Sequence, residues 1–226
     1  MATQVENGKA FEWVMGATLK EKGFQIIENS SAIKNEKCFN KVSQGKKEIF
    51  LQNSKLAIEH ILLKEDLSEG RFNFLSDDEE QSGDVQDIVK KSKSKVFGMS
   101  CKTNHTSYKH SRLSDKVNFV SKWGLHPKRC SQEYLDLVSQ IFGKLRKIKC
   151  DSVGKALWRD MSDVPQRFYW PVLDAFEKEI LHMQSPTVCA NLVQYLIGKE
   201  DFYKVVSRNK QVEITAFNIN NNLKVS

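Results

Sequence analysis

The sequence predicts a mixed α/β protein in which a central β-sheet is flanked by helices. Residues 7–23 and 131–150 carry apolar side chains at helical spacing, in each case along one face. Residues 72–75 alternate weakly as a strand, and residues 202–219 have the pattern of two strands. Because helical and strand-like patterns alternate along the chain, a sheet covered by helices is the expected architecture.

The first half of the chain opens with an amphipathic helix and continues with shorter elements. We expect this helix to begin at Asn7, a residue type that suits a helix cap, and to stop at Gly23. The letters FQII at residues 24–27 predict a short strand. Residues 31–65 are helical in pattern, and the letters SQGKK at residues 43–47 mark the joint between two segments.

The second half of the chain is predicted to be mostly helical before it ends in strands. After the helix at residues 131–150, further helices are expected at residues 171–183 and 187–198. Two strands then follow around Arg208 and Asn209.

The sequence shows no feature that divides it into domains. We find no internal repeat and no low-complexity linker, so a single domain over residues 1–226 is expected. The chain stops at NNNLKVS without a closing element, although a late hairpin usually needs a third strand or a helix for stability. We therefore expect the natural protein to continue past Ser226, with a C-terminal portion lacking here.

Composition indicates a folded protein with a basic surface. The 226 residues are 40% hydrophobic, enough to bury a sizeable core, and the formal net charge of +7 favours polyanionic partners. Five cysteines without a CxxC pair argue against a disulfide framework or a zinc site and indicate a reducing compartment. No leader segment is evident, and no apolar run approaches the roughly 18 residues that span a bilayer, so a soluble, intracellular protein is expected.

The segment GDVQDIVKKSKSKVFGMSCKTNH, residues 83–105, predicts a β-hairpin with its turn at residues 92–94. Pairing of the two strands about this turn would set Asp87 opposite residues close to Met99 and Ser100. Alternate side chains of a strand share a face, so the hydroxyl of Ser100 and the ammonium group of Lys102 would point the same way.

An aspartate, a hydroxyl and a lysine on one face suggest a site that holds a divalent metal against a phosphate. Asp87 supplies the hard oxygen that Mg²⁺ prefers. Lys102 would orient a water molecule or stabilise negative charge that builds on a phosphate in the transition state. On spacing alone, a surface hairpin with solvated charges explains the same residues, and that alternative stays open.

The hairpin resembles the PD-(D/E)XK nuclease motif, in which an acid precedes a strand and a second acid stands two residues before a lysine. Asp87 followed by the letters IV, and the letters SCK on the next strand, match this motif except at Ser100, which replaces the second acid. More specifically, the letters GMSCKTNH and KHSRLSDK resemble the HaeIII family of type II restriction endonucleases. The letters NGKAFEWV, DFYKVV and VEITAFNI extend the resemblance over most of the chain, and residues 98–116 are its most specific part.

The resemblance implies a PD-(D/E)XK-like central sheet flanked by helices and a type II restriction endonuclease. The implied reaction is Mg²⁺-assisted hydrolysis of phosphodiester bonds in double-stranded DNA at a short site, GGCC in this family. A prokaryotic, cytoplasmic location and a cognate DNA methyltransferase as a functional, not physical, partner are also implied. The family pattern includes a further C-terminal region that is absent here.

Two further acids belong to the candidate metal site. A glutamate of the first helix often points into the site of PD-(D/E)XK nucleases, so the resemblance gives Glu12 the charge that Ser100 lacks. A solvent-facing acid in the first turn of the helix is the alternative. Asp84 competes with Asp87 for the role of metal ligand, and Asp87 is preferred because it directly precedes the letters IV and falls across from Ser100.

The polar segment after the second strand is the candidate DNA-binding region. Lysine and arginine neutralise phosphates or reach guanine, and asparagine, serine and threonine satisfy other base edges. An exposed basic loop is the alternative explanation, and the spacing of the two histidines does not match a zinc site. The candidate DNA-binding residues are Asn104, His105, Lys109, His110, Ser111 and Arg112.

Two functions from different classes remain. The first is the Mg²⁺-dependent, site-specific endonuclease, with Asp87, Ser100, Lys102 and Glu12 as its catalytic residues. The second is a catalytically inactive DNA-binding protein on a nuclease fold, in which Ser100 marks the loss of the metal site. The presence of Lys102 favours the active enzyme.

Overall fold

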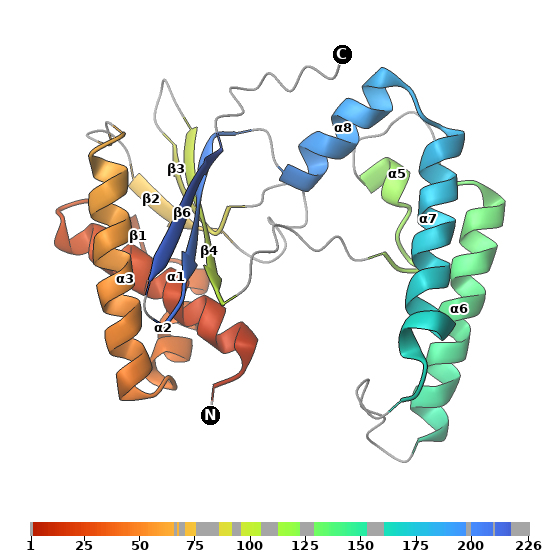
Figure 1. The fold of residues 1–226 in the computed structure, drawn as a ribbon, viewed down its shortest axis with the longest axis horizontal. Coiled ribbons are helices and arrows are strands. Elements are labelled where there is room, and N and C mark those ends of the chain that lie inside the picture. Colours follow the sequence, from red (N-terminus) through yellow and green to blue (C-terminus); the bar gives the residue numbers. More distant parts are fainter. Residues whose placement is uncertain are drawn as a thin grey trace. The chain divides into compact units, whose positions relative to one another are not determined.

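A computed structural model gives the fold of the chain. It describes residues 2–65, 67, 71–75, 86–91, 96–104, 113–122, 129–152, 161–197, 200–209 and 211–217. The strands in these residues form one mixed sheet in the order β1-β2-β3-β4-β5-β6, and the expected α/β architecture with flanking helices is confirmed (Figure 1). The strands are β1 Gln25–Ile27, β2 Arg71–Phe74, β3 Ile88–Lys91, β4 Val96–Thr103, β5 Phe202–Ser207 and β6 Val212–Phe217.

The described helices occupy the N-terminal part of the chain and the stretch between β4 and β5. They are α1 Gln4–Glu21, α2 Ser30–Asn40, α3 Gln44–Leu62, α5 Phe119–Lys122, α6 Gln132–Asp151, the π-helical turn η2 Pro165–Tyr169, α7 Trp170–His182 and α8 Pro186–Ile197. None of these helices carries a run that is long and apolar enough for a membrane span.

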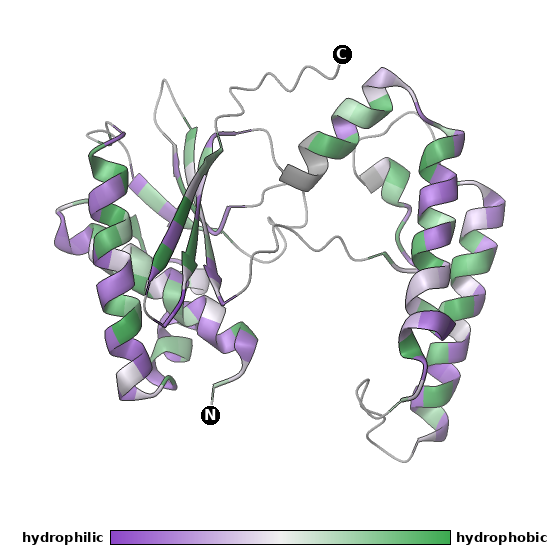
Figure 2. Ribbon diagram, in the orientation of Figure 1, coloured by the Kyte–Doolittle hydropathy of each residue, from purple (hydrophilic) through white to green (hydrophobic). Residues whose placement is uncertain are grey.

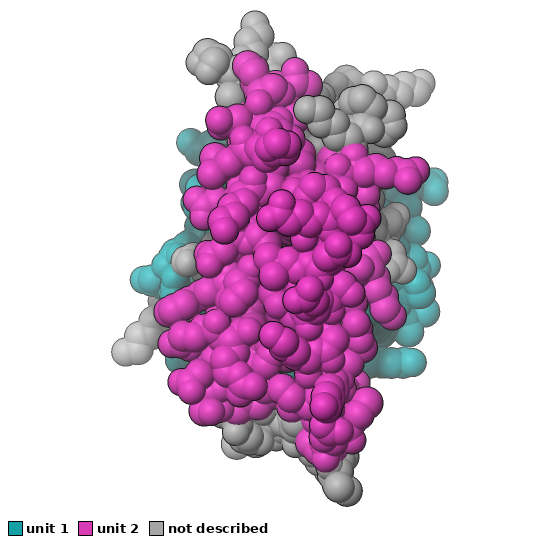
Figure 3. Space-filling view, turned by 90° about the vertical axis from the view of Figure 1, so that its right-hand side faces the viewer, with its two compact units in different colours: residues 1–109, 196–223 teal, residues 110–195, 224–226 magenta. Residues whose placement is uncertain are grey.

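The chain packs as two compact units, residues 1–109 with 196–223 and residues 110–195 with 224–226 (Figure 3). The first unit holds the sheet together with α1, α2 and α3. The second holds α6 and α7, along which hydrophilic and hydrophobic residues alternate as expected for helices that bury one face (Figure 2). The division into two compact units does not test the expected single domain over residues 1–226, which stays a prediction.

The core of the first unit lies between one face of the sheet and the helices α1 and α3. Phe11 of α1, Phe50 of α3 and Phe72 of β2 are fully or almost fully buried in it. In β4, Phe97, Met99 and Cys101 point into the same core. Because side chains alternate along a strand, Ser100 and Lys102 point to the opposite face of the sheet.

The start of the first helix differs from the expectation. The helix begins three residues before Asn7, at Gln4, and Thr3 is its cap, so the prediction of Asn7 as the cap is wrong. Thr3 accepts a hydrogen bond from the Glu6 N–H group, and the Glu6 carboxylate accepts one from the Thr3 N–H group. This capping box leaves Asn7 inside the helix. The expected end at Gly23 is confirmed by its φ of +90°, a conformation that favours glycine.

Candidate active site

The hairpin β3–β4 has the register that the sequence predicts. Ile88 pairs with Met99, which sets Asp87 opposite Ser100, and the Asp87 N–H group donates to the Met99 carbonyl at 2.8 Å. Gly98 permits this packing, because a Cβ atom there would lie 2.3 Å from the side chain of Gln86. Since Gln86 directly precedes Asp87, the glycine helps to seat the acid at the end of the hairpin.

Asp87 is a buried carboxylate with two donors. Its Oδ2 atom accepts a hydrogen bond from the Cys101 N–H group and one from Lys102 Nζ at 3.2 Å. The side chain of Asp87 is 3% exposed and that of Lys102 is 18% exposed, so water screens this ion pair only in part. The structure therefore brings two of the predicted site residues into direct contact.

Lys102 is held in its charged form. Burial acts to lower the pKa of its ammonium group, but attraction to Asp87 and Glu12 and the hydrogen bond to Asp87 outweigh burial and raise the pKa above its ordinary value. An ammonium group with a raised pKa stays protonated at neutral pH. Lys102 is therefore suited to donate hydrogen bonds and to stabilise negative charge, and not to take a proton.

Glu12 lies on α1, which is fastened to the end of β4. Gln4 Nε2 at the start of the helix donates to the Thr103 carbonyl at 2.7 Å. Glu12 is 4% exposed, and its Oε2 atom accepts hydrogen bonds from Lys9 Nζ at 3.2 Å and Asn35 Nδ2 at 2.9 Å. The alternative of a solvent-facing acid in the first turn is wrong, because the helix begins at Gln4 and this face of it is buried.

Asp87 and Glu12 act on the same stretch of β4. Both carboxylates help to raise the pKa of the Lys102 ammonium group. For the buried Cys101 thiol, burial is the main cause of a raised pKa, and repulsion by the same two carboxylates adds to it. Glu12 is therefore within electrostatic reach of Lys102, the ion-pair partner of Asp87, and both acids act on Cys101.

Asn35 was not foreseen from the sequence. It comes from α2, is 1% exposed, and donates to the Glu12 carboxylate, whereas its own Oδ1 atom is buried and has no hydrogen-bond partner among the described residues. A signal did exist, because Asn35 follows the buried Ala32 by three residues on the inner face of the helix. A polar side chain on the buried face of a helix needs a partner, and here that partner is Glu12.

Lys204 is a second residue beside the site that the sequence did not predict. Parallel pairing of β4 and β5 places Lys204 in register with Ser100, and both residues are almost fully buried. Burial and the repulsion of Lys102 lower the pKa of the Lys204 ammonium group, while Glu213 opposes them. The position where the motif of other nucleases carries an acid is thus a serine with lysines beside it.

Among the candidate DNA-binding residues, the structure describes Asn104. Asn104 follows β4 with a φ of 60°, is exposed, and donates its N–H group to the Ser207 carbonyl at 3.0 Å. Asp84, the rival metal ligand, lies outside the described residues. So do five of the six candidates for DNA contact, namely His105, Lys109, His110, Ser111 and Arg112.

Asp87, Glu12 and Asn35 carry oxygen atoms that could serve as ligands of Mg²⁺. Protein sites for this ion usually supply one or two carboxylates, and water and substrate phosphate complete the octahedron. Asp87 and Glu12 are two such carboxylates, and the unpaired Oδ1 atom of Asn35 is a further hard oxygen beside Glu12. No group of three or more histidine, cysteine or acidic side chains occurs in the described part of the chain, so a cage of protein ligands alone is not formed there.

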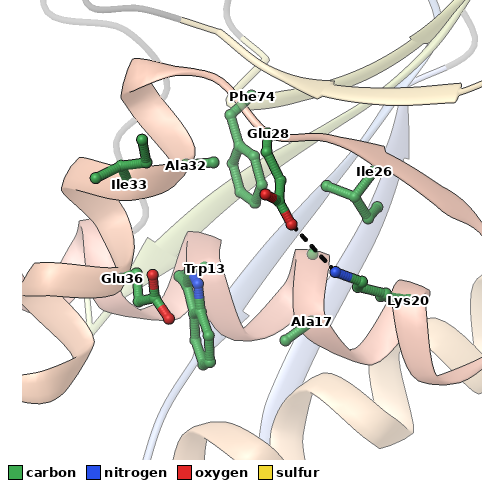
Figure 4. Close-up of a pocket in the computed structure, with 10 residues that line it drawn as sticks. Trp13, Ala17, Lys20, Ile26, Glu28, Ala32, Ile33, Glu36 and Phe74 are labelled. Atoms are coloured by element: carbon green, nitrogen blue, oxygen red, sulfur yellow. Dashed lines mark hydrogen bonds and ion pairs between the residues drawn. The ribbon is translucent and has the colours of Figure 1, made fainter.

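A separate pocket of about 190 Å³ lies between α1, α2 and the first strands. Figure 4 shows Trp13 and Phe74 at this pocket, and a bridge of 3.2 Å between Lys20 Nζ and Glu28 Oε1. Neither Glu12 nor Asp87 lines it. The acid and lysine cluster is therefore distinct from this hollow.

The fold and the cluster together define a class: a mixed α/β nuclease-like protein with an acid and a lysine at the end of a hairpin. Comparison with known proteins gives the family. The model of the family described as HaeIII restriction endonuclease matches residues 8–226, and the chain belongs to this family. It is thus a type II restriction endonuclease, a site-specific deoxyribonuclease.

One relative supports the same assignment. The chain is 32% identical over 235 aligned residues to the type II restriction enzyme HaeIII of Haemophilus aegyptius, and the match covers 96% of this chain and 72% of the relative. No solved structure matches the chain. The family resemblance expected from the sequence is therefore confirmed.

Proposed function

We propose that this protein hydrolyses phosphodiester bonds of double-stranded DNA at a short specific site, GGCC, with Mg²⁺ as its cofactor. The observation that carries the proposal is the buried pair of Asp87 and Lys102, with Glu12 in electrostatic reach of the same lysine. A cytoplasmic location in a prokaryote and a cognate DNA methyltransferase as functional partner belong to the same proposal.

The proposed role of each site residue follows from its charge. Asp87 and Glu12 would hold Mg²⁺, which when bound activates water and offsets charge on the phosphate. The Lys102 ammonium group donates to a phosphate oxygen as negative charge develops there, and this stabilises the transition state. Ser100 offers a neutral hydroxyl on the same face, and Asn35 and Lys9 keep the Glu12 carboxylate in place.

The segment that follows β4 is the one proposed to contact the DNA bases. Asn104 stands at its start, and His105, Lys109, His110, Ser111 and Arg112 continue it. Side chains of these types contact phosphates and base edges in specific complexes. Their position directly after the strand that carries Lys102 would set them beside the scissile phosphate. Asp84 stays a second proposed ligand for Mg²⁺.

The test is digestion of a plasmid with mapped GGCC sites, in Mg²⁺ and in EDTA, followed by sequencing of the fragment ends. We expect cleavage in Mg²⁺ and none in EDTA, and the fragment ends should lie inside GGCC. Lys102→Ala and Asp87→Asn should each lower the cleavage rate at least about a hundredfold. Lys22→Ala is the matched control, because Lys22 lies at the end of α1 in an exposed bridge to Glu59. Normal cleavage by Lys102→Ala would contradict the proposed mechanism.

One observation favours the second candidate, an inactive DNA-binding protein. Ser100 stands in place of an acid, and Asp87 already accepts two hydrogen bonds. This candidate gains support if DNA binding persists in EDTA but no nick appears with any divalent metal. Cleavage that Mg²⁺ restores after EDTA would exclude it.

A further inference from the structure

A basic groove of about 610 Å³ runs between α1 and α2. Four lysines line it: Lys9 from α1, Lys34 and Lys37 from α2, and Lys41, the residue that directly follows α2. Glu6 is the acid in its lining, which leaves a net charge of three positive. We refer to this feature as the lysine groove.

The charges of the lysine groove are arranged along one side of α2. Lys34, Lys37 and Lys41 follow each other at intervals of three and four residues, the spacing that places side chains on one helical face. All three are exposed. From Lys34 to Lys41 the helix rises about 10 Å. One strand of B-DNA presents a phosphate about every 3.4 Å along its axis, so about three phosphates pass over the same length.

The groove is continuous with the candidate active site. Lys9 lines the groove, and the same ammonium group bonds the Glu12 carboxylate at 3.2 Å. Asn35, the other partner of Glu12, lies on α2 between Lys34 and Lys37. A polyanion that follows the lysines therefore arrives next to Glu12, one of the two carboxylates proposed to hold the metal.

The negative charge of Glu6 in the lysine groove is already neutralised by an ion pair. Lys41 Nζ bonds the Glu6 carboxylate at 2.8 Å, and this hydrogen bond, together with those to Thr3, lowers the pKa of Glu6 to about 2. The apolar side chains of Val5 and Ile33 in the groove are 73% and 52% exposed. They would suit a protein partner, but burying four ammonium groups beneath such a partner carries a high desolvation cost.

We propose that the lysine groove binds the phosphate backbone of the DNA that this enzyme cleaves. The proposal rests on the proposed function and adds to it a second contact surface, on helices that precede the catalytic hairpin. Contacts to phosphates orient the duplex and carry no sequence information. The groove should therefore raise the affinity for every DNA equally, while the segment after β4 supplies the preference for GGCC.

The experiment measures binding by fluorescence anisotropy with Ca²⁺ in place of Mg²⁺. The probes are one 30-base-pair duplex with a central GGCC and one with the site scrambled, each titrated over a series of salt concentrations. The groove variant is Lys34→Gln, Lys37→Gln and Lys41→Gln combined. The matched control combines Lys22→Gln, Lys55→Gln and Lys64→Gln, which removes the same charge from exposed positions of the same unit outside the groove. Thermal melting shows that both variants are folded.

The expected result is a selective loss in the groove variant. Its slope of log K against log salt should fall by about 0.9 for each lost phosphate contact, and by about 2.7 where all three lysines contact phosphates. Its affinity at low salt should fall at least about tenfold, in the same proportion for both duplexes, while the control stays within about twofold of the wild type.

Two results would overturn the proposal, and they differ from failure of the proposed function. If the groove variant keeps the wild-type salt slope and affinity, the groove does not bind DNA, even when the wild type cleaves normally. If groove variant and control lose affinity equally, the effect is one of net charge and the groove has no special role. Wild-type protein that binds both duplexes but never cleaves with Mg²⁺ contradicts the proposed function and leaves the groove result to stand by itself.

Discussion

The two buried carboxylates of the site are held in the same way. Glu12 accepts hydrogen bonds from Lys9 and from the neutral amide of Asn35. Asp87 accepts from Lys102 and from the neutral N–H group of Cys101. A buried charge with both an ion-pair partner and a neutral donor is costly to disturb, because removal of either partner leaves it undercompensated.

Asn35 gives a prediction at the scale of one side chain. Asn35→Ala removes a donor to Glu12, so the Mg²⁺ concentration for half-maximal cleavage should rise about tenfold or more, the usual cost of losing a partner behind a metal ligand. The measurements are Mg²⁺ titration of the cleavage rate and Mn²⁺ binding by calorimetry. The control is Asn53→Ala, since Asn53 is also buried and donates to Ser207, away from Glu12. Unchanged Mn²⁺ binding by Asn35→Ala would contradict the prediction.

The sequence predicts only part of the site at this scale. The placement of Asp87 opposite Ser100 followed from strand alternation and the turn, both of which are local rules. Asn35 and Lys204 were missed because their partners come from elements distant in the chain. Periodicity says which face a side chain occupies, but it does not say which element packs against that face.

Elements with a strong local pattern were predicted, and long-range pairings were not. The helix α6 was expected from its apolar period, and the structure confirms it at Gln132–Asp151. The start of α1 was misplaced because the capping box of Thr3 and Glu6 lies ahead of the first apolar residue used to locate the helix. The parallel pairing of β4 with β5 was not predicted, since about a hundred residues separate the two strands and nothing in either encodes its neighbour.

The strand β5 is joined to the segment after α3 by one hydrogen bond with a testable pH dependence. Tyr203 Oη donates to Glu65 Oε1 at 3.0 Å, and burial followed by this hydrogen bond raises the pKa of Tyr203 to about 12. A phenol whose pKa is raised by folding stabilises the fold fully below its unfolded value of about 10, and this contribution is lost as pH rises through the folded value.

We therefore expect Tyr203→Phe to lower the free energy of unfolding by about 1 kcal/mol at pH 8, the usual net worth of a hydrogen bond. The difference between wild type and variant should be constant up to pH 10 and shrink between pH 10 and 12. Urea denaturation at a series of pH values measures it. A difference that grows with alkaline pH would contradict the assigned direction of the pKa shift.

At the scale of the molecule, the proposed catalytic residues belong to one unit. Glu12, Asp87, Ser100 and Lys102 all lie in the unit formed by residues 1–109 and 196–223. That unit is discontinuous in sequence, because residues 110–195 separate its two parts. A ligand that binds the site should therefore stabilise this unit specifically.

Metal binding gives the prediction at this scale. A ligand present at about a hundred times its dissociation constant stabilises the folded state by about 2.7 kcal/mol. Saturating Mg²⁺ should thus raise the melting temperature of the wild type by several degrees, and EDTA should reverse the rise. Asp87→Asn should show little or no rise, whereas Asp136→Asn, on the exposed side of α6, should respond as the wild type does. Equal rises in all three proteins would argue against Asp87 as a metal ligand.

The neighbour relation of β4 and β5 has a consequence for synthesis of the protein. The strand that carries Ser100 and Lys102 leaves the ribosome about a hundred residues before its parallel partner, and until then one row of its backbone groups has no ladder to join. The nascent chain must hold an unfinished sheet while residues 110–195 are made. A chaperone that shields exposed strand edges would act during that interval, and slower translation after residue 103 would lengthen it.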